Sequence, residues 1–310
     1  MQESFPIPSK PSFAKVSRNR RLFRKRIVPW LFVLPVLSLN VLVVLGPALS
    51  AIYYSLTDWN GIGAPEFIGL ENFRRMLFDD TSFGRAFLNN LIWMAIFLTV
   101  PVTLALLAAT LLARIRRGAM GFRIALFIPY VLPAVITAFA WRFLMSPTFG
   151  LGAQLAKLGI PGLDQAWLGK PETSLFAVAF VDNWHWWGFL MMLFLAAMQN
   201  VPPELYEAAR IDGASRWDEF RNVTLPGIRP TLIFMLLMTA IWSFLAFDYV
   251  WILTRGGPAG SSEVLGVLVF KAAFSNLESG YASAIGLTLS FFTLLIIGLF
   301  VMLRRRGWEI

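Results

Sequence analysis

Long apolar stretches alternate with short polar connections along nearly the whole chain. Six of these stretches are long enough, at roughly 20 residues each, for a helix to cross the hydrocarbon core of a bilayer. They lie near residues 28–55, 86–113, 122–145, 174–199, 230–253 and 284–303. The pattern therefore predicts an all-α, polytopic membrane protein with six transmembrane helices.

The composition supports a membrane location. Of the 310 residues, 57% are hydrophobic and 15% are charged, an apolar excess that a soluble domain could not hide. The run Ala48-Leu49-Ser50-Ala51 is similar to a signal-peptide cleavage site. A long basic region and a long apolar run precede it, which favours an uncleaved first span.

The distribution of positive charge predicts which side of the membrane each connection faces. Eight of the 27 lysines and arginines precede residue 28, and eleven more lie within 114–123, 210–229 and 304–306. By the positive-inside rule, these segments and both termini are cytoplasmic. We expect a basic cytoplasmic tail at 1–27, a six-helix domain at 28–306 and a cytoplasmic tail at 307–310. The topology accounts for the net charge of +9, so no nucleic-acid partner is expected, although the basic tail could touch anionic lipid.

The sequence lacks the residues that thiolate catalysis, a multi-histidine metal site or a nucleotide-binding loop would need. The chain has no cysteine and a single histidine, His185, which exclude thiolate catalysis and a multi-histidine metal site. Neither Gly169-Lys170 nor Gly61-Ile62-Gly63 has the flanking residues of a nucleotide-binding loop. We therefore expect no catalytic residue, metal or cofactor in this chain. If ATP drives the protein, another subunit must bind it.

A polar segment at 202–226 separates the fourth and fifth apolar stretches. Its run Glu-Ala-Ala at 207–209 is followed three residues later by Gly213 and, after nine more residues, by Val-Thr-Leu-Pro at 223–226. The prolines at 202–203 can start a helix, and Gly213 suits the left-handed residue that ends one. This helix would offer a small, mostly apolar stripe to another protein, or would lie on the membrane surface as an amphipathic helix.

The spacing of this segment resembles the EAA loop, the cytoplasmic signature of ATP-binding-cassette (ABC) importer permeases, with valine in place of the usual isoleucine. Other stretches are similar to the carbohydrate branch of that family, in particular to the first permease of maltose and glycerol-phosphate importers. These stretches are 67–73, 129–133 with Trp141 beyond, 254–258 and 280–283. The resemblance covers roughly residues 28–306.

The resemblance implies a multi-pass subunit of a prokaryotic plasma membrane importer that works by alternating access. The implied partners are a second homologous permease, a dimeric ABC ATPase that binds ATP and magnesium, an extracytoplasmic solute-binding protein and a sugar. The implied residues that couple transport to the ATPase lie on a cytoplasmic coupling helix: Glu207, Ala208, Ala209, Arg210, Asp212 and Gly213. Among these, Arg210 could pair with an acidic surface of the ATPase.

Two helical faces are candidates for the substrate path, and the same regions contribute to the sugar site in the resembling transporters. Asp182, His185, Trp186 and Phe189 share one face of the fourth span, and Thr239, Trp242 and Ser243 share one face of the fifth. Aromatic rings beside hydrogen-bonding groups suit a sugar. Alternatively, the tryptophans form an interfacial belt, and the hydroxyls bond their own backbone or join helices.

Three other functions remain open at this point. A phosphorylated polyol such as glycerol 3-phosphate should require several cations inside the spans, which contain few. An ion-driven secondary carrier needs titratable groups deep in the bundle, and apart from Asp182 and His185 the spans offer almost none. A membrane-embedded enzyme would need a catalytic cluster, and the sequence contains no recognisable arrangement of that kind.

Overall fold

The computed structural model describes residues 29–115 and 117–305, with side chains up to residue 302. The predicted tails at 1–27 and 307–310 lie outside the described residues. The chain divides into two units, residues 1–53 and 54–310. The first contains all but the last residue of an apolar helix, Pro29–Tyr54, which includes a π-helical turn, η1 (Val41–Leu45), and α2 (Gly46–Tyr54). At 26 residues it is about 39 Å long, enough to cross a membrane.

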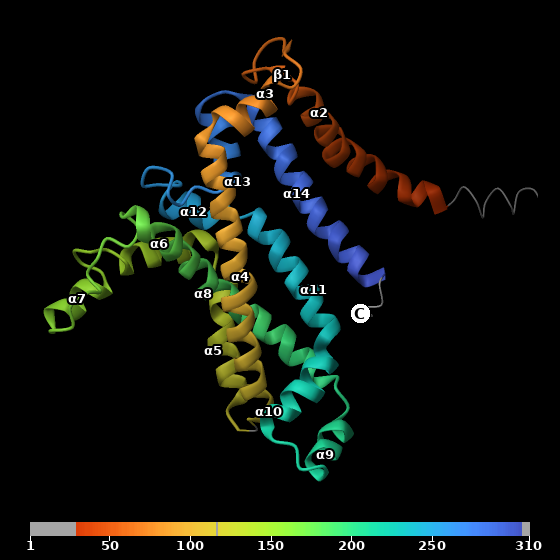
Figure 1. The fold of residues 1–310 in the computed structure, drawn as a ribbon, viewed down its shortest axis with the longest axis vertical. Coiled ribbons are helices and arrows are strands. Elements are labelled where there is room, and N and C mark those ends of the chain that lie inside the picture. The colour runs from red at the N-terminus through yellow and green to blue at the C-terminus, as the bar shows by residue number, and fades with distance from the viewer. Residues whose placement is uncertain (1–28, 116, 306–310) are drawn as a thin grey trace, which may run out of the picture. The chain divides into compact units, whose positions relative to one another are not determined.

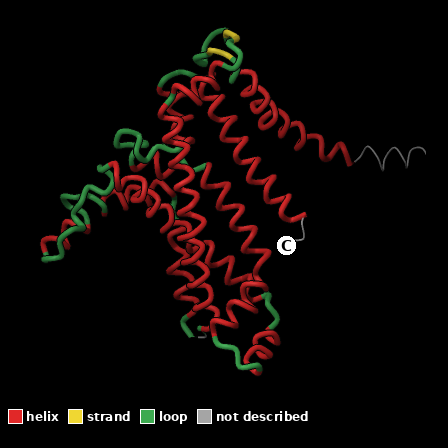
Figure 2. The backbone as a smooth tube through the Cα atoms, in the orientation of Figure 1, coloured by secondary structure: helices red, strands yellow, loops and turns green. Residues whose placement is uncertain are grey.

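The second unit is almost entirely helical, with one short hairpin of two strands (Figures 1 and 2). Its elements in chain order, with η for a π-helical turn, are β1 (Thr57–Asp58), β2 (Glu66–Phe67), α3 (Glu71–Arg74), η2 (Arg75–Asp79), α4 (Thr81–Arg114), α5 (Ala119–Val131), α6 (Ala134–Leu144), α7 (Leu151–Lys157), α8 (Pro171–Gln199), α9 (Pro203–Ile211), α10 (Arg216–Glu219), η3 (Phe220–Thr224), α11 (Leu225–Phe244), α12 (Asp248–Leu253), α13 (Leu265–Phe270), η4 (Lys271–Ser275) and α14 (Ser279–Arg305). The strands pair antiparallel, with Thr57 opposite Phe67.

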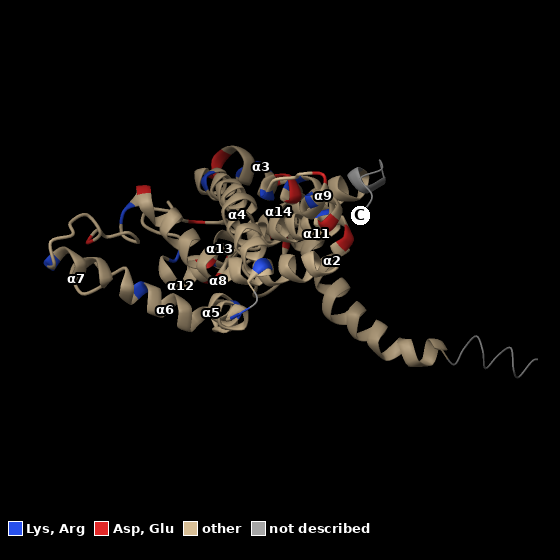
Figure 3. Cartoon of the chain, turned by 90° about the horizontal axis from the view of Figure 1, so that it is seen from below, with Lys and Arg blue, Asp and Glu red and all other residues tan. Residues whose placement is uncertain are grey.

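Long helices form the centre of this unit. Helix α4 packs against α8 and α11, α8 packs against α5, and α11 packs against α14. The short helices α9 and α10 lie at one end of the unit, and α12, α13 and the hairpin lie toward the other (Figure 1). The buried side chains of α4 and α8 include Trp93 and Phe194. Figure 3 shows few charged residues along the long helices.

Four described helices are long and apolar enough to cross a membrane, which confirms the predicted all-α membrane class. They are Pro29–Tyr54, Thr81–Arg114, Arg216–Leu253 and Ser279–Met302. Helices α5 and α6 together can form a fifth span. Helix α8 has 29 residues, but it is not one of these four spans because Asp182, Asn183 and His185 lower its hydropathy. The predicted count of six is therefore approximate.

The third expected span, 122–145, is not a straight helix. It is divided into α5 and α6, which are bent by 98° at residues 132–133. A residue that precedes proline avoids the helical conformation, and Leu132 adopts an extended one before Pro133. Gly188 allows α8 to approach α5 closely, since a Cβ atom there would lie 2.0 Å from the carbonyl oxygen of Leu126. Pro133 thus accounts for the bend between α5 and α6, and Gly188 for the close approach of α5 and α8.

Candidate functional site

The first candidate region is the coupling segment, residues 202–226. Its helix α9 begins at Pro203 and ends at Ile211, where the sequence places it. Gly213 has a φ of +80°, and its N–H donates to the carbonyl of Arg210 at 3.1 Å. The N–H of Ala214 donates to the carbonyl of Ala209 at 2.9 Å. These bonds end α9 with a left-handed glycine, as predicted.

The segment then turns into α10 through a reciprocal cap. The Oγ of Ser215 accepts from the backbone N–H of Asp218 at 3.3 Å, and Oδ2 of Asp218 accepts from the N–H of Ser215 at 3.0 Å. This capping box satisfies backbone donors that the helix itself leaves free. The π-helical turn η3 leads from α10 into α11. The path of the chain here is therefore set largely by residues close in sequence.

Glu219 joins α9 to the rest of the second unit. Its side chain is 8% exposed and accepts from Arg210 Nε at 2.7 Å and from Arg114 Nη2 at 3.3 Å. The hydrogen bond and charge of Glu219 raise the pKa of Arg210. The hydroxyls of Tyr206 and Thr224 also lie 3.1 Å apart. Arg210, which the sequence left free to pair with an acidic surface of the ATPase, is thus paired within the chain.

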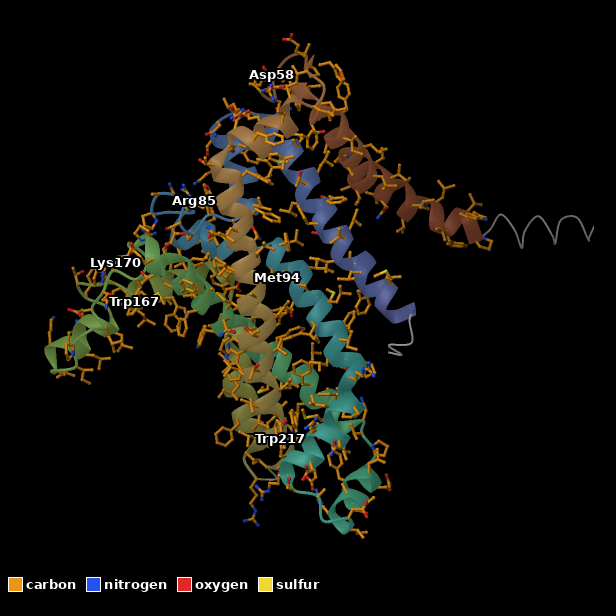
Figure 4. All side chains as sticks on the ribbon, viewed as in Figure 1. Asp58, Arg85, Met94, Trp167, Lys170 and Trp217 are labelled. Carbon is orange, nitrogen blue, oxygen red and sulfur yellow. The ribbon has the colours of Figure 1, made fainter. Side chains whose placement is uncertain are left out.

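The outer surface of the coupling segment remains uncovered in this chain. Among the predicted coupling residues, Ala209 is half-buried, whereas Glu207, Ala208, Arg210, Asp212 and Gly213 are exposed. Three large apolar side chains around them are also exposed: Leu205 at 51%, Ile211 at 86% and Trp217 at 65%. Figure 4 shows Trp217 at the end of the second unit that carries α9 and α10. Exposed apolar side chains grouped in this way favour contact with another surface.

The second candidate region is a small cavity between α4, α8 and α11, which we call the path pocket. Seven residues line it: Trp93, Phe97, Asp182, Trp186, Thr239, Trp242 and Ser243. Its volume is about 110 Å³. The rings of Trp186 and Trp242 meet edge to face with centroids 4.5 Å apart. Five of the seven predicted path residues therefore lie together.

The other two predicted path residues lie beside the pocket rather than in it. His185 and Phe189 pack around Tyr130 of α5, with ring centroids 5.4 and 4.5 Å from the tyrosine ring. Phe189 also contacts Trp186, at 5.1 Å. These two residues support the wall of the pocket from the α5 side.

The polar groups of the pocket differ in how they are satisfied. Ser243 donates to the carbonyl of Thr239 at 2.7 Å, the backbone bond that is the common use of a hydroxyl in a membrane helix. In contrast, Trp186 Nε1 and Thr239 Oγ1 are buried and have no hydrogen-bond partner among the described residues. Buried polar atoms usually have a partner, so these two atoms are available to a ligand or water.

Sequence reasoning missed three residues of this region. Trp93 and Phe97 of α4 stack at 5.4 Å on one side of the pocket. Asp248 lines an adjoining cavity of about 180 Å³ together with Asp182 and Trp242. The spacing of Asn90, Trp93 and Phe97 along one helical face was a signal that could have identified the contribution of α4.

Asn90 positions the ends of the helices around the pocket. Its Nδ2 donates to the carbonyl of Ser243 at 2.9 Å, and its Oδ1 accepts from the N–H of Leu265 at 2.8 Å. The side chain thereby joins α4 to the end of α11 and the start of α13. Within the described ranges, no group of three or more His, Cys, Asp or Glu side chains is arranged to hold a metal ion.

Solved structures share this fold. A bacterial alginate ABC transporter, solved in complex with an alginate pentasaccharide-bound periplasmic protein, contains a chain with a TM-score of 0.81 and 22% identity. The match covers 93% of this chain and 98% of that one. A chain of the MetNI methionine ABC transporter matches with a TM-score of 0.52 and 17% identity, over 72% of this chain and 94% of the other.

Relatives are similar in sequence over most of the chain. The probable ABC transporter permease protein YurN of Bacillus subtilis is 35% identical over 87% of this chain and 94% of its own length. The diacetylchitobiose uptake system permease protein NgcF of Streptomyces coelicolor is 37% identical over 93% of this chain and 85% of its own length. Residues 102–308 match the family of binding-protein-dependent transport system inner membrane components. The chain therefore belongs to that family and is an ABC transporter permease.

Proposed function

We propose that this chain is the permease subunit of an ATP-driven, binding-protein-dependent importer and forms half of the translocation pathway for a sugar or oligosaccharide. The observation that carries the proposal is the path pocket. There, the rings of Trp186 and Trp242 meet beside the carboxylate of Asp182. Two atoms of the lining, Trp186 Nε1 and Thr239 Oγ1, have no hydrogen-bond partner among the described residues. Aromatic rings pack on the C–H faces of a sugar, and the polar atoms exchange hydrogen bonds with its hydroxyls.

Relatives support the sugar class. Besides the diacetylchitobiose permease, a trehalose/maltose transport system permease of Thermococcus litoralis is 32% identical over 86% of this chain. A probable permease for starch degradation products from Thermoanaerobacterium thermosulfurigenes is 33% identical over 87%. The names of these proteins refer to carbohydrates of different lengths, so they support the class rather than one sugar.

The size of the pocket favours a second permease as partner. A water molecule occupies about 30 Å³ of liquid volume, so the path pocket has room for about four and the adjoining cavity for about six. Neither cavity is fully enclosed. We propose that a homologous second permease completes the wall, and that an extracytoplasmic solute-binding protein delivers the sugar.

We propose that the coupling segment contacts a dimeric ABC ATPase on the cytoplasmic side, where both termini also lie. The exposed residues Glu207, Ala208, Asp212 and Gly213, with Leu205, Ile211 and Trp217 around them, provide the contact surface. Arg210 holds the segment through Glu219. The ATPase binds ATP and magnesium, and this chain carries no cofactor. Movement of α9 with the ATPase then rocks the helix bundle between outward and inward states.

Transport of a phosphorylated polyol is the second candidate. One relative, the sn-glycerol-3-phosphate transport system permease of Pectobacterium atrosepticum, is 30% identical over 93% of this chain. However, the described residues lining the path pocket and the adjoining cavity include the carboxylates Asp182 and Asp248 and neither lysine nor arginine. Carboxylates repel a phosphate, so the lining favours a neutral sugar.

The proposed function is tested by ATP hydrolysis in a reconstituted complex. The chain is co-expressed with its candidate sister permease and ATPase, placed in lipid and mixed with binding protein loaded with maltose, trehalose or diacetylchitobiose. We expect sugar-loaded binding protein to stimulate hydrolysis. An assembled complex that responds to glycerol 3-phosphate and to no carbohydrate would overturn the sugar assignment.

A further inference from the structure

A third cavity lies behind the coupling segment. It is bounded by the end of α4, the start of α5, the end of α8, and by α9, α10 and η3 of the coupling segment. Its volume of about 380 Å³ has room for about a dozen waters. Its polar lining comes from eight side chains: Thr110, Arg114, Arg123, Gln199, Tyr206, Arg210, Glu219 and Thr224. We call this cavity the arginine pocket.

Its charges do not balance. Three arginines, Arg114, Arg123 and Arg210, face one carboxylate, Glu219, which leaves two net positive charges. Glu219 is already shared by Arg210 Nε and Arg114 Nη2. The third arginine has no such partner, because Arg123 Nε is buried without a hydrogen-bond partner among the described residues. Leaving a buried donor of a charged group without an acceptor costs free energy. An anion bound beside Arg123 would supply the missing acceptor.

We infer that the arginine pocket binds a phosphate group, either of an anionic lipid headgroup or of a small soluble phosphate. A phosphate offers several oxygens and one to two negative charges, which match the excess charge and the planar donors of arginine. Arg114 ends a membrane-spanning helix, so the pocket lies where a lipid headgroup can enter. Basic pockets between helices at this level of a membrane protein commonly hold lipid headgroups.

Occupancy would change the attachment of the coupling helix. Arg123 belongs to α5, whereas Arg210 belongs to α9 and makes its only described ion pair with Glu219. A phosphate between them adds an acceptor that both arginines can share, and so joins α9 to the bundle more firmly. Phosphate binding goes beyond the proposed transport function and does not depend on the identity of the transported solute.

Binding of an anionic lipid headgroup to the arginine pocket is tested with the full chain in nanodiscs made of equal parts phosphatidylcholine and phosphatidylglycerol. Native mass spectrometry after release measures which lipid is retained. We expect phosphatidylglycerol to be enriched and Arg123→Gln to lower its retention about tenfold, the loss typical of one charged hydrogen bond. Arg117→Gln is the matched control, since Arg117 is an exposed arginine of the connection between α4 and α5 that lies outside the pocket lining.

Binding of a small soluble phosphate to the arginine pocket is tested with the chain in nanodiscs of phosphatidylcholine alone. Inorganic phosphate should raise the unfolding temperature of the wild-type chain above that in chloride at equal ionic strength, and Arg123→Gln should abolish the rise. Arg123→Lys, which keeps the charge but loses the planar donors, should give an intermediate effect. The wild-type measurement needs no mutant and stands even if Arg123→Gln fails to fold.

Two results would overturn the inference. One is equal phosphatidylglycerol retention by the wild type and Arg123→Gln together with no response to inorganic phosphate. The other is an effect of Arg123→Gln that appears only when the ATPase is bound, which would assign the pocket to a carboxylate of that protein. Neither result bears on whether sugar stimulates ATP hydrolysis, so the transport proposal is tested separately.

Discussion

The coupling segment and the path pocket differ in the range of the interactions that form them. In the coupling segment, the Ser215–Asp218 cap spans three residues and the Arg210–Glu219 pair spans nine. In the path pocket, Trp93 of α4 meets Asp182 of α8 and Thr239 of α11, which are far apart in the sequence. The asparagine that joins two of these helices, Asn90, reaches across 153 residues to Ser243.

This difference determines what a local pattern can reveal. A segment formed by short-range bonds keeps a fixed residue spacing, so its helix and its terminal glycine can be read directly from the sequence. A pocket formed by three helices has no such spacing. Each helix contributes a face that looks like ordinary membrane packing, and the faces acquire a common role only where the helices meet.

The largest expected effect comes from Gly213→Pro in the coupling segment. Proline fixes φ near −65°, whereas Gly213 has a φ of +80° and donates its N–H to Arg210. Forcing proline into this conformation costs about 3 kcal/mol, which lowers the population of the native conformation of the segment roughly a hundredfold. We expect sugar-stimulated ATP hydrolysis to fall by that order, while sugar binding is unchanged.

Gly63→Pro is the matched control, because Gly63 also has a φ of +80° and open space around it but lies outside the coupling segment. Normal stimulation in Gly213→Pro, or an equal loss in Gly63→Pro, would contradict a specific role of the segment.

The next largest effect is expected from Gly188→Ala, which acts on the helices around the path pocket. The added Cβ would lie 2.0 Å from the carbonyl oxygen of Leu126, so α5 and α8 must separate. Overpacking of this kind costs about 1–3 kcal/mol. The measurement is the unfolding temperature in lipid, which should fall. Gly286→Ala in α14 meets no atom within 4 Å and should not lower the unfolding temperature.

A smaller effect is expected from Trp186→Phe in the path pocket. The substitution keeps an aromatic ring but removes the unpartnered Nε1–H. Loss of one hydrogen bond to sugar should raise the half-maximal sugar concentration for transport about tenfold in proteoliposomes. Trp184→Phe is the control on the same helix, since Trp184 packs on Trp141 and does not line the pocket. Equal shifts in both variants would remove Trp186 from the substrate path.

The smallest effect is expected from Glu219→Gln, which weakens the attachment of α9. Because Arg114 and Arg210 are 38% and 63% exposed, solvent screens both pairs, and the loss of free energy should be small. Hydrogen exchange of the α9 amides should become about fivefold faster. Glu71→Gln removes an exposed pair with Arg74 and should not change exchange in α9. Unchanged exchange in Glu219→Gln would show that Tyr206 and the backbone suffice to hold α9.

Particular residues show how far the sequence could predict this protein. The coupling helix, its proline start and Gly213 were predicted because each follows from local backbone preferences. The faces containing Trp186 and Trp242 were found from helical spacing, but their edge-to-face contact was not. The internal pairing of Arg210 was missed because Glu219 lies on a different helix, whose direction depends on the turn between them.

The sequence by itself determined the all-α membrane class, the extent of most spans and the coupling segment, because these depend on hydropathy and short-range geometry. Only the tertiary structure decided the meeting of Trp93 with Asp182 and Thr239 and the excess of arginine behind α9. Both features form where separate helices meet, and the meeting point is controlled by packing between residues that are distant in the sequence.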